Sequence, residues 1–576
     1  MGVIQSDALV FACSSASCSY PALRRFSLSF SNNVPIRKLS SRIFSTYCSP
    51  ASSVKLPEKP LVCTADELHY VTVPNSDWRL ALWRYLPSHK APVRSHPLLL
   101  LSGVGTNAIG YDLSPECSFA RNMSKNGYDT WILEVRGAGL TLEASNVKDI
   151  KRFAKSTSKK LETFASIAID SQRELENSCA RSTSSISELG NRREVATAWD
   201  ESKLVSSLSD TFMRLSETLS GLLNETQLKT MSTMFLDQIS TLLEDTQLSE
   251  SLNDIRVKLL NLISEKENSG IAFQIRNLSE RLVNVIEEGQ RSVSPPFLDI
   301  QGRLVSTIDD FQRQLDIIVK YNWDFDNFLE EDIPAVMEYI KEQTKPSDGK
   351  LLAIGHSMGG ILLYSMLSKY AYEGKEPGFT AIVTLASSLD YSSSDTKFKM
   401  LTPIVDPAQA LNVPVLPLGT ILAATFPLSS RPPYLLSWLK YFISADNMMQ
   451  PDTLEKLVMN NFCTIPMKLI IQLRTAMNEG GLRDRSGTFV YKDHLHKTTV
   501  PVLALAGDQD LICPPEAVED TVKALPRHLA RYQIFGQDGG PHYAHYDLVG
   551  SKLAVNEIYP CVVEFLNLHD CKSSLR

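Results

Sequence analysis

Paired cysteine motifs are missing from this sequence. It contains ten cysteines, but none of them forms a C-x-x-C pair. Zinc ribbons and thioredoxin-type redox sites need such pairs, so the sequence argues against both. The cysteines stand singly along the chain, which fits a reducing compartment better than a secreted disulfide framework. No motif in the sequence indicates a metal or an organic cofactor.

Long uninterrupted apolar runs and a surplus of basic residues are also missing. The best apolar candidate, Leu411–Leu428, contains Pro414, Pro417 and Pro427, which would break a membrane-spanning helix. We therefore expect a soluble protein or one in peripheral contact with a membrane. The formal net charge is −7, and the lack of a basic surplus argues against broad nucleic-acid binding. No nucleic-acid partner is expected.

Acidic residues are almost absent from the N-terminal segment. Up to Pro50 the only one is Asp7, in a stretch that is rich in serine. Leaders that are rich in arginine and serine and poor in acidic residues are typical of organelle transit peptides. The serine content favours a plastid, so we expect a chloroplast protein with a disordered transit peptide over residues 1–55. An untargeted disordered tail is the alternative. The basic residues of this stretch are Arg24, Arg25, Arg37, Lys38 and Arg42.

Strands and helices are predicted to alternate along most of the remaining chain. Residues 69–73 and 80–85 alternate in polarity around a turn, which predicts an antiparallel hairpin at a sheet edge. Leu98–Leu101 is apolar throughout, as expected of a strand buried on both faces. The alternation predicts an α/β fold with a mostly parallel sheet and helices on both faces. Further strands are predicted at 130–135, 350–354, 381–385, 502–505 and 531–535, and helices at 119–125, 328–341, 361–370 and 555–566.

Two segments interrupt this alternation. Residues 146–320 carry leucines at helical spacing and almost no strand signal, which predicts an inserted helical hairpin or bundle. Such a stripe is typical of core packing or a coiled-coil seam, and it is also a candidate surface for a protein partner. Residues 391–497 are predicted to form a mostly helical cap or lid. The α/β core is then expected in three parts, 56–145, 321–390 and 498–576.

A short motif between a predicted strand and a predicted helix indicates a nucleophile. Residues 355–359, Gly-His-Ser-Met-Gly, match G-x-S-x-G, and Gly360 continues the run of small residues. A serine on a sharp strand-to-helix turn projects its hydroxyl above the sheet, and the flanking glycines relieve crowding in that turn. Ser357 is therefore the candidate nucleophile. The alternative is a tight turn with a purely structural role.

A nucleophilic serine needs a base, and the base needs an orienting acid. In this architecture both are expected after the serine, in the order acid, then histidine. The strand at 502–505 is followed by two aspartates. Asp510 stands clear of the strand end and before a proline, so it is the candidate acid. Asp508 lies closer to the strand, where we expect it to cap the turn, and it is the alternative.

The candidate base lies in the loop after the last predicted strand. His545 stands at a junction between that loop and a helix, which is the expected position of the triad histidine. His542 precedes it in the same loop and is the alternative. His528 is expected on the surface of a helix ahead of the last strand.

The tetrahedral intermediate of acyl transfer needs backbone N–H donors for its oxyanion. One donor is expected at Met358, directly after the nucleophile. The other is expected at Val104, in the loop after Leu98–Leu101, because Gly103 and Gly105 would let the backbone turn this N–H inward. A plain glycine turn is the alternative.

Taken together, these motifs resemble those of the α/β-hydrolase superfamily. Residues 323–335, Trp-Asp-Phe to Glu-Asp-Ile-Pro-Ala, are similar to the stretch ahead of the nucleophile in acid lipases, and His545-x-Asp547 also resembles theirs. The resemblance is to plant plastid hydrolases of this kind, and it covers about residues 68–140 and 320–570 but not the insertion. Ser102 departs from the pattern, since these lipases usually have histidine there. The motifs are Leu98–Gly105, Trp131–Gly139, Gly355–Gly360, Gly507–Pro514 and His545–Leu548.

The expected activity is that of a serine carboxylester hydrolase acting through an acyl-enzyme. Ser357 would attack the carbonyl, His545 would move the proton and Asp510 would orient the histidine. The apolar cap favours a lipid or another hydrophobic acyl ester as the substrate. An acyltransferase on the same triad is one alternative, because it differs only in excluding water from the acyl-enzyme. A non-catalytic receptor or scaffold, whose insertion binds a protein, is the other.

Overall fold

The computed structural model describes most of the chain outside the leader and the insertion. Every described residue lies in one compact unit, Lys59–Arg576. The predicted transit peptide (1–55) and nearly all of the predicted insertion (146–320) lie outside the described residues, so these two remain predictions. The described ranges are 63–143, 281, 306–308, 311–312, 315–397, 399, 414–430, 437–536 and 538–570.

A nine-stranded mixed sheet forms the centre of the described chain. Its first two strands pair antiparallel at one edge, as the hairpin pattern predicts, and every pair from β4 to β11 is parallel. The order is β1-β2-β4-β3-β6-β7-β10-β11, with the short β5 on β2. The strands are β1 (Glu67–Thr72), β2 (Trp78–Tyr85), β3 (Leu98–Leu101), β4 (Thr130–Glu134), β5 (Leu142–Glu143), β6 (Leu351–His356), β7 (Phe379–Leu385), β10 (Val502–Gly507) and β11 (Ala530–Phe535).

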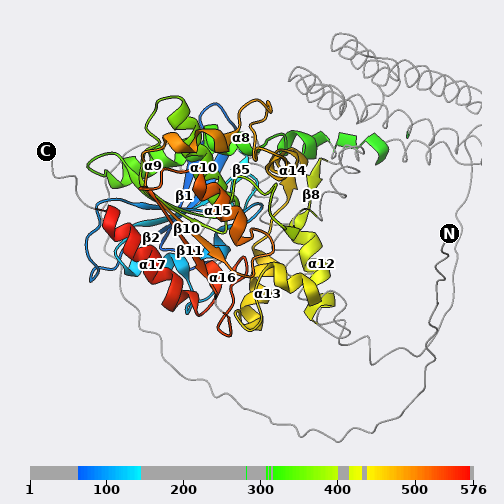
Figure 1. Ribbon diagram of the computed structural model, residues 1–576. Helices are drawn as coiled ribbons and strands as arrows, with labels where there is room; N and C mark the ends of the chain where they lie inside the picture. Colours follow the sequence, from blue (N-terminus) through cyan, green and yellow to red (C-terminus); the bar gives the residue numbers. More distant parts are fainter. Residues whose placement is uncertain are drawn as a thin grey trace, which may run out of the picture. The chain divides into compact units, whose positions relative to one another are not determined.

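The central strands are buried on both faces. All four leucines of β3 are buried; Leu98 and Leu100 join one apolar core, whereas Leu99 and Leu101 join another. Successive side chains of a strand point to opposite faces, so an all-leucine strand needs a helical layer on each side. In Figure 1, α9 and α10 lie on one side of the sheet and α17 on the other.

The helices that cover the sheet match the predicted helical segments. Their boundaries extend the predicted ones by a few residues at most places. The helices are α1 (Phe119–Lys125), α8 (Phe325–Asn327), α9 (Ile333–Thr344), α10 (Met358–Tyr372), α15 (Pro515–Lys523), α16 (Asp547–Gly550) and α17 (Ala554–His569), with a π-helical turn at Phe328–Asp332 and a 3₁₀ turn at Ala108–Tyr111. The expected α/β-hydrolase fold is thereby confirmed, from its strand order and from the direct passage of β6 into α10.

Two details of the expected helices were wrong. His528 lies in a turn rather than on a helix, because α15 ends at Lys523 and Pro526 prevents its continuation. Pro427 lies inside α12 (Leu418–Ser430) instead of ending it, so only Pro414 and Pro417 stand ahead of this helix. Among the described residues, no helix is both long and apolar enough to cross a membrane.

The segment predicted as a cap is mostly helical where it is described. One stretch of it runs beside the loop that follows β3: the N–H of Asn107 donates to the carbonyl of Asn461 (3.0 Å), and the N–H of Cys463 donates to that of Gly105 (2.7 Å). This segment therefore reaches the carboxyl end of the sheet. Its elements are α12, α13 (Pro451–Asn460), α14 (Met467–Arg474), the strands β8 (Val415–Leu416) and β9 (Ile465–Pro466), and 3₁₀ turns at Ser437–Phe442, Thr475–Met477 and Tyr491–Lys497.

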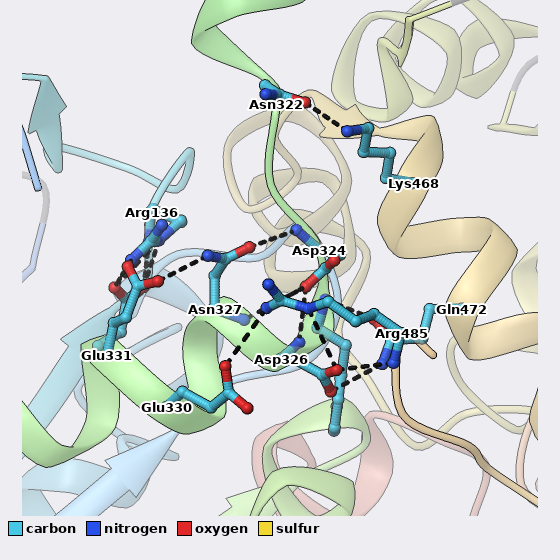
Figure 2. Close-up of polar contacts among 12 residues, drawn as sticks. Arg136, Asn322, Asp324, Asp326, Asn327, Glu330, Glu331, Lys468, Gln472 and Arg485 are labelled. Atoms are coloured by element: carbon cyan, nitrogen blue, oxygen red, sulfur yellow. Dashed lines mark hydrogen bonds and ion pairs between the residues drawn. The ribbon is translucent and has the colours of Figure 1, made fainter. Parts of the chain in front are cut away.

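A polar cluster ties the same segment to the stretch that leads into α9 (Figure 2). Asp326 is buried and accepts hydrogen bonds from the Gln472 amide (2.8 Å), the Tyr491 hydroxyl (2.8 Å) and the backbone N–H of Arg485 (2.7 Å). Figure 2 shows Arg136, which follows β4, on the far side of this stretch. Its guanidinium holds the buried carboxylate of Asp332 through Nε at 3.0 Å. Because a buried charge without a partner is costly, these paired groups fix the stretch between the sheet and the cap segment.

A buried histidine joins three separate parts of the fold near the amino end of β3. His96 contacts Asp570, which follows α17, through Nδ1 at 2.9 Å and Asp348 through Nε2 at 3.2 Å. Burial opposes the charge on the ring, but the hydrogen bonds and charges of the two carboxylates outweigh it and raise the pKa of His96. The imidazolium form can donate to both carboxylates at once.

We expect His96→Gln to destabilise the protein more in mild acid than in mild alkali. A raised folded-state pKa gives stability that is present below the unfolded pKa and is lost as pH rises through the folded pKa. The difference in unfolding free energy between wild type and variant should be roughly 1–2 kcal/mol at about pH 6 and smaller at about pH 9. Urea unfolding at both pH values measures this difference in unfolding free energy. A difference that stays constant or grows with pH would contradict a stabilising role for the contacts of His96 with Asp570 and Asp348.

Candidate active site

The predicted nucleophile occupies a strained turn between a strand and a helix. Ser357 has φ 55° and ψ −121°, directly after β6 and before α10. A non-glycine residue with positive φ costs free energy, and such strain persists only where the surroundings impose it. Here the N–H of Ser357 donates to the carbonyl of Leu385 (2.9 Å), and its own carbonyl accepts from the Ser387 hydroxyl (2.8 Å). The neighbouring strand β7 therefore holds the turn in place.

Three glycines make this turn sterically possible. A Cβ added at Gly359 would lie 2.0 Å from the carbonyl oxygen of Leu101, and one at Gly360 would lie 2.2 Å from the Ser387 hydroxyl. A Cβ at Gly355 would lie 2.3 Å from the backbone of the first turn of α10. The run of small residues is thus required because α10 starts in direct contact with the backbones of β3 and β6.

The predicted acid and base form a buried pair. His545 Nδ1 lies 2.8 Å from Asp510 Oδ2, and the two side chains are 3% and 0% exposed. The other oxygen of Asp510 accepts the N–H groups of Ile512 (2.9 Å) and Cys513 (2.8 Å), which fixes the carboxylate. A carboxylate at Nδ1 assigns the proton to that nitrogen, so Nε2 is left to take a proton from a nucleophile.

The two alternative residues form a second pair of their own. Asp508 accepts from Nδ1 of His542 and from the N–H of Tyr543 (2.8 Å). This pair is more open to solvent, with His542 36% and Asp508 23% exposed. Each aspartate therefore takes one histidine of the same loop. Asp508 bridges to the histidine loop instead of capping its own turn.

A histidine that the motif treats as a variable position connects the base to the nucleophile. His356 Nε2 donates to the carbonyl of His545 at 2.9 Å, and the two rings lie 4.8 Å apart. Burial, with a further contribution from His545, lowers the pKa of His356 to about 3, so its ring is neutral. The sequence analysis did not single out His356. Its position directly before the candidate nucleophile was the signal that could have identified it. Ser357 Oγ makes no hydrogen bond to any residue that the structure describes, and such bonds are often long in unliganded enzymes.

The loop after β3 lies against the nucleophile, as the oxyanion prediction requires. A Cβ added at Gly103 would lie 3.3 Å from Cβ and 3.6 Å from Oγ of Ser357. Gly105 has φ 58°, a left-handed conformation that glycine adopts without strain. Met358, one predicted donor, begins α10 directly after Ser357, and Val104, the other, directly follows Gly103, which lies against the serine. Their action on an oxyanion stays a prediction.

A buried carboxylate that sequence reasoning overlooked holds this loop. Glu134, at the end of β4, accepts the N–H groups of Ala108 (2.9 Å) and Leu140 (2.7 Å). Burial raises the pKa of Glu134, although these bonds act in the opposite direction. A Cβ at Gly139 would lie 2.2 Å from this carboxylate, so the glycine is needed for the close approach. The signal that could have identified Glu134 is its charge at the end of an otherwise apolar predicted strand.

Asp547 connects the histidine loop to the cap segment. Its carboxylate accepts from the Ser444 hydroxyl (2.6 Å) and from the N–H groups of Ala445 (2.7 Å) and Ala544 (2.9 Å). The N–H of Tyr546 also donates to a carbonyl of that segment (2.8 Å). The base is therefore held from two directions, by its acid and by the cap segment.

A small cavity beside the loop after β3 holds space for about one water molecule. Within the described residues, no group of three or more histidine, cysteine, aspartate or glutamate side chains is placed to hold a metal ion. The cavity is lined by Ser102, Gly103, Thr106, Gly110, Tyr111, His356, Asn461, Tyr546 and Val549.

No protein-family model and no curated protein matches the chain. Among solved structures it is similar to a soluble variant of monoglyceride lipase from Saccharomyces cerevisiae in complex with a substrate analog. The two chains are 13% identical. The match covers 89% of this chain and 99% of that chain, and the TM-score is 0.37.

Two further solved structures are similar at comparable sequence identity and TM-score. An alpha/beta fold family hydrolase from Bacillus anthracis is 10% identical, covers 87% of this chain and 99% of its own, and has a TM-score of 0.35. Naproxen esterase from Bacillus subtilis is 10% identical, covers 88% of this chain and 94% of its own, and has a TM-score of 0.32. Likenesses this distant carry no assignment of function, which has to come from the geometry of the site.

Two alanine substitutions at glycines should separate stability from activity. Gly359→Ala places a methyl group against the backbone of β3, which cannot move aside, so we expect a loss of about 3 kcal/mol or more in unfolding free energy. At Gly103→Ala the nearest atoms to the new methyl group are in the side chains of Ser357 (3.3 Å) and Thr106 (3.6 Å) and not in the backbone, so we expect a folded protein with impaired ester hydrolysis. Thermal unfolding and esterase assays compare the two, and a Gly359→Ala protein as stable as wild type would refute this account of the turn.

Asp547→Asn should change how stability depends on pH. Burial raises the pKa of Asp547 from 3.8 to about 7, so the folded state binds a proton that the unfolded state does not hold in this range. The stability of wild type relative to the variant should therefore rise as pH falls from about 8 to about 5. Asparagine can accept both N–H groups with its one oxygen and donate its amide to the Ser444 hydroxyl without a charge, so the variant should unfold a few degrees above wild type at the higher pH. Thermal scans at both pH values test this, and the opposite trend would contradict it.

Proposed function

We propose that this chain is a serine hydrolase that cleaves a carboxylic ester through a Ser357–His545–Asp510 triad. The observation that carries the proposal is the buried Asp510–His545 pair (2.8 Å), joined through His356 to a serine in a strained strand-to-helix turn. Burying two ionisable groups and straining a turn both cost stability. Their coincidence at one end of the sheet favours catalysis over a structural role.

In the proposed mechanism, Ser357 Oγ attacks the ester carbonyl while Nε2 of His545 takes its proton. Asp510 keeps the imidazole in the required tautomer and stabilises the imidazolium that forms. The N–H groups of Met358 and Val104 donate to the oxyanion of the tetrahedral intermediate. The imidazolium then protonates the leaving alcohol, and water releases the acid from the acyl-enzyme by the same steps in reverse.

A hydrophobic acyl group is the proposed substrate feature. The apolar helix α12 contains no charged residue, and Ile421 on it is 43% exposed. Leu418, the first residue of α12, lies within 3.8 Å of the position that a Cβ at Gly105 would take, next to the predicted oxyanion loop. An apolar surface that begins beside the predicted oxyanion loop supports a lipid or another hydrophobic ester.

Location and partners are part of the same proposal. The leader over residues 1–55 supports a chloroplast protein, since its composition is that of a plastid transit peptide. The proposed enzyme would be soluble or in peripheral contact with a membrane, where hydrophobic esters are found. The insertion at 146–320 is the proposed surface for a protein partner. Import of the full chain into isolated chloroplasts, with a chain lacking residues 1–55 as the control, tests the location.

Ser357→Ala should abolish both ester hydrolysis and covalent labelling by a fluorophosphonate probe. Asp510→Asn should lower kcat by roughly 10⁴-fold, because the asparagine amide favours the wrong histidine tautomer. Hydrolysis of p-nitrophenyl butyrate and mass spectrometry of the labelled peptide measure the two effects. Full esterase activity in Ser357→Ala protein would overturn the assignment.

The same experiment distinguishes the two other activities. Labelling at Ser357 without ester hydrolysis, together with ester formation when an alcohol is added, would indicate an acyltransferase. Absence of labelling in the folded wild-type protein would indicate a receptor or scaffold. Ser393→Ala is a suitable control, because this serine is exposed and its hydroxyl donates to Asp520 on α15 instead of supporting the turn at Ser357.

A further inference from the structure

The turn after β10 presents two carboxylates, two residues apart, to the loop that carries the base. Asp510 holds His545 in the protein interior, and Asp508 holds His542 nearer the surface. The mechanism described above uses only the inner pair, so the outer pair has no role in it.

The outer pair belongs to a dense set of contacts between this turn and the loop. The N–H of Gln509 donates to the carbonyl of Tyr543 (3.0 Å), and Asp508 accepts the N–H of the same tyrosine (2.8 Å). A Cβ at Gly507 would lie 2.3 Å from the Tyr543 carbonyl, and one at Gly536 would lie 2.0 Å from the Asp508 carboxyl carbon. Both glycines therefore permit the close approach that the outer pair requires.

The base depends on such contacts because the described residues of its loop, between β11 and α16, form no regular secondary structure. The bond from Asp510 orients the ring of His545, but it does not fix the path of the backbone three residues earlier. Asp508 fixes that path at His542 and Tyr543. Proton transfer is sensitive to displacements of about 1 Å, which can cost about 100-fold in rate.

We propose that Asp508 and His542 are positioning residues that hold the loop so that His545 faces Ser357. This inference rests on the proposed function, since it concerns the same site.

The test uses the full chain, with p-nitrophenyl butyrate as substrate and a fluorophosphonate as substrate-independent probe. Asp508→Asn removes the charge but keeps an acceptor for the N–H of Tyr543. His542→Ala removes the donor, whereas His542→Asn places an amide N–H where Nδ1 stood. His528→Ala is the matched control, because this histidine is exposed and lies in the turn before β11.

We expect Asp508→Asn and His542→Ala each to lower kcat about tenfold with KM nearly unchanged. The double variant should be no slower than the slower single variant, because both changes break one interaction. His542→Asn should recover most of the activity, and His528→Ala should match wild type. Melting temperatures confirm that the variants compared are folded, and His542→Asn keeps the test open if His542→Ala does not fold.

Wild-type rates in both single variants would overturn the inference, as would losses that multiply in the double variant. A His542→Asn protein as slow as His542→Ala would overturn it too. These outcomes are distinct from failure of the proposed function. In that case the probe would not label Ser357 in wild type, whereas here wild type reacts and Ser357→Ala does not.

Discussion

The close approach of α10 to the sheet is the constraint on which the rest of this structure depends. Gly359 touches the carbonyl of Leu101 on β3, and Gly360 touches Ser387 after β7, so the helix begins in contact with two neighbouring strands. That contact leaves the chain only a sharp turn between β6 and α10, with Ser357 at positive φ. The loop after β3 can then approach the serine, because Gly103 has no side chain and leaves just enough space for that of Ser357.

Around this turn, buried carboxyl groups that accept several hydrogen bonds give the site its order. Glu134 secures the loop after β3, Asp510 secures the base and Asp547 secures the same histidine loop to the cap segment. Each carboxylate accepts at least two hydrogen bonds, which offsets the cost of its burial. Separate segments of the chain are thus held in one geometry by groups that would be unfavourable alone.

The cap segment is fastened on both sides of the site. Asp326 and its partners hold it to the stretch ahead of α9 (Figure 2). Asp547 holds it to the histidine loop. The apolar helix α12 starts beside the loop after β3. A segment placed in this way can shape the space above the serine without supplying a triad residue.

The sequence by itself determined the strands, most helices and the turn at Ser357, because these follow from local periodicity and from glycines at fixed spacing. It also narrowed the acid and the base to two residues each. Only the tertiary structure decided that Asp510 pairs with His545 and Asp508 with His542. The roles of His356 and Glu134 also came from the structure alone. The two aspartates are two residues apart and the two histidines three apart, so each pair has the same kind of local sequence environment. The register of β10 against β11 and the burial of the inner pair distinguish their roles.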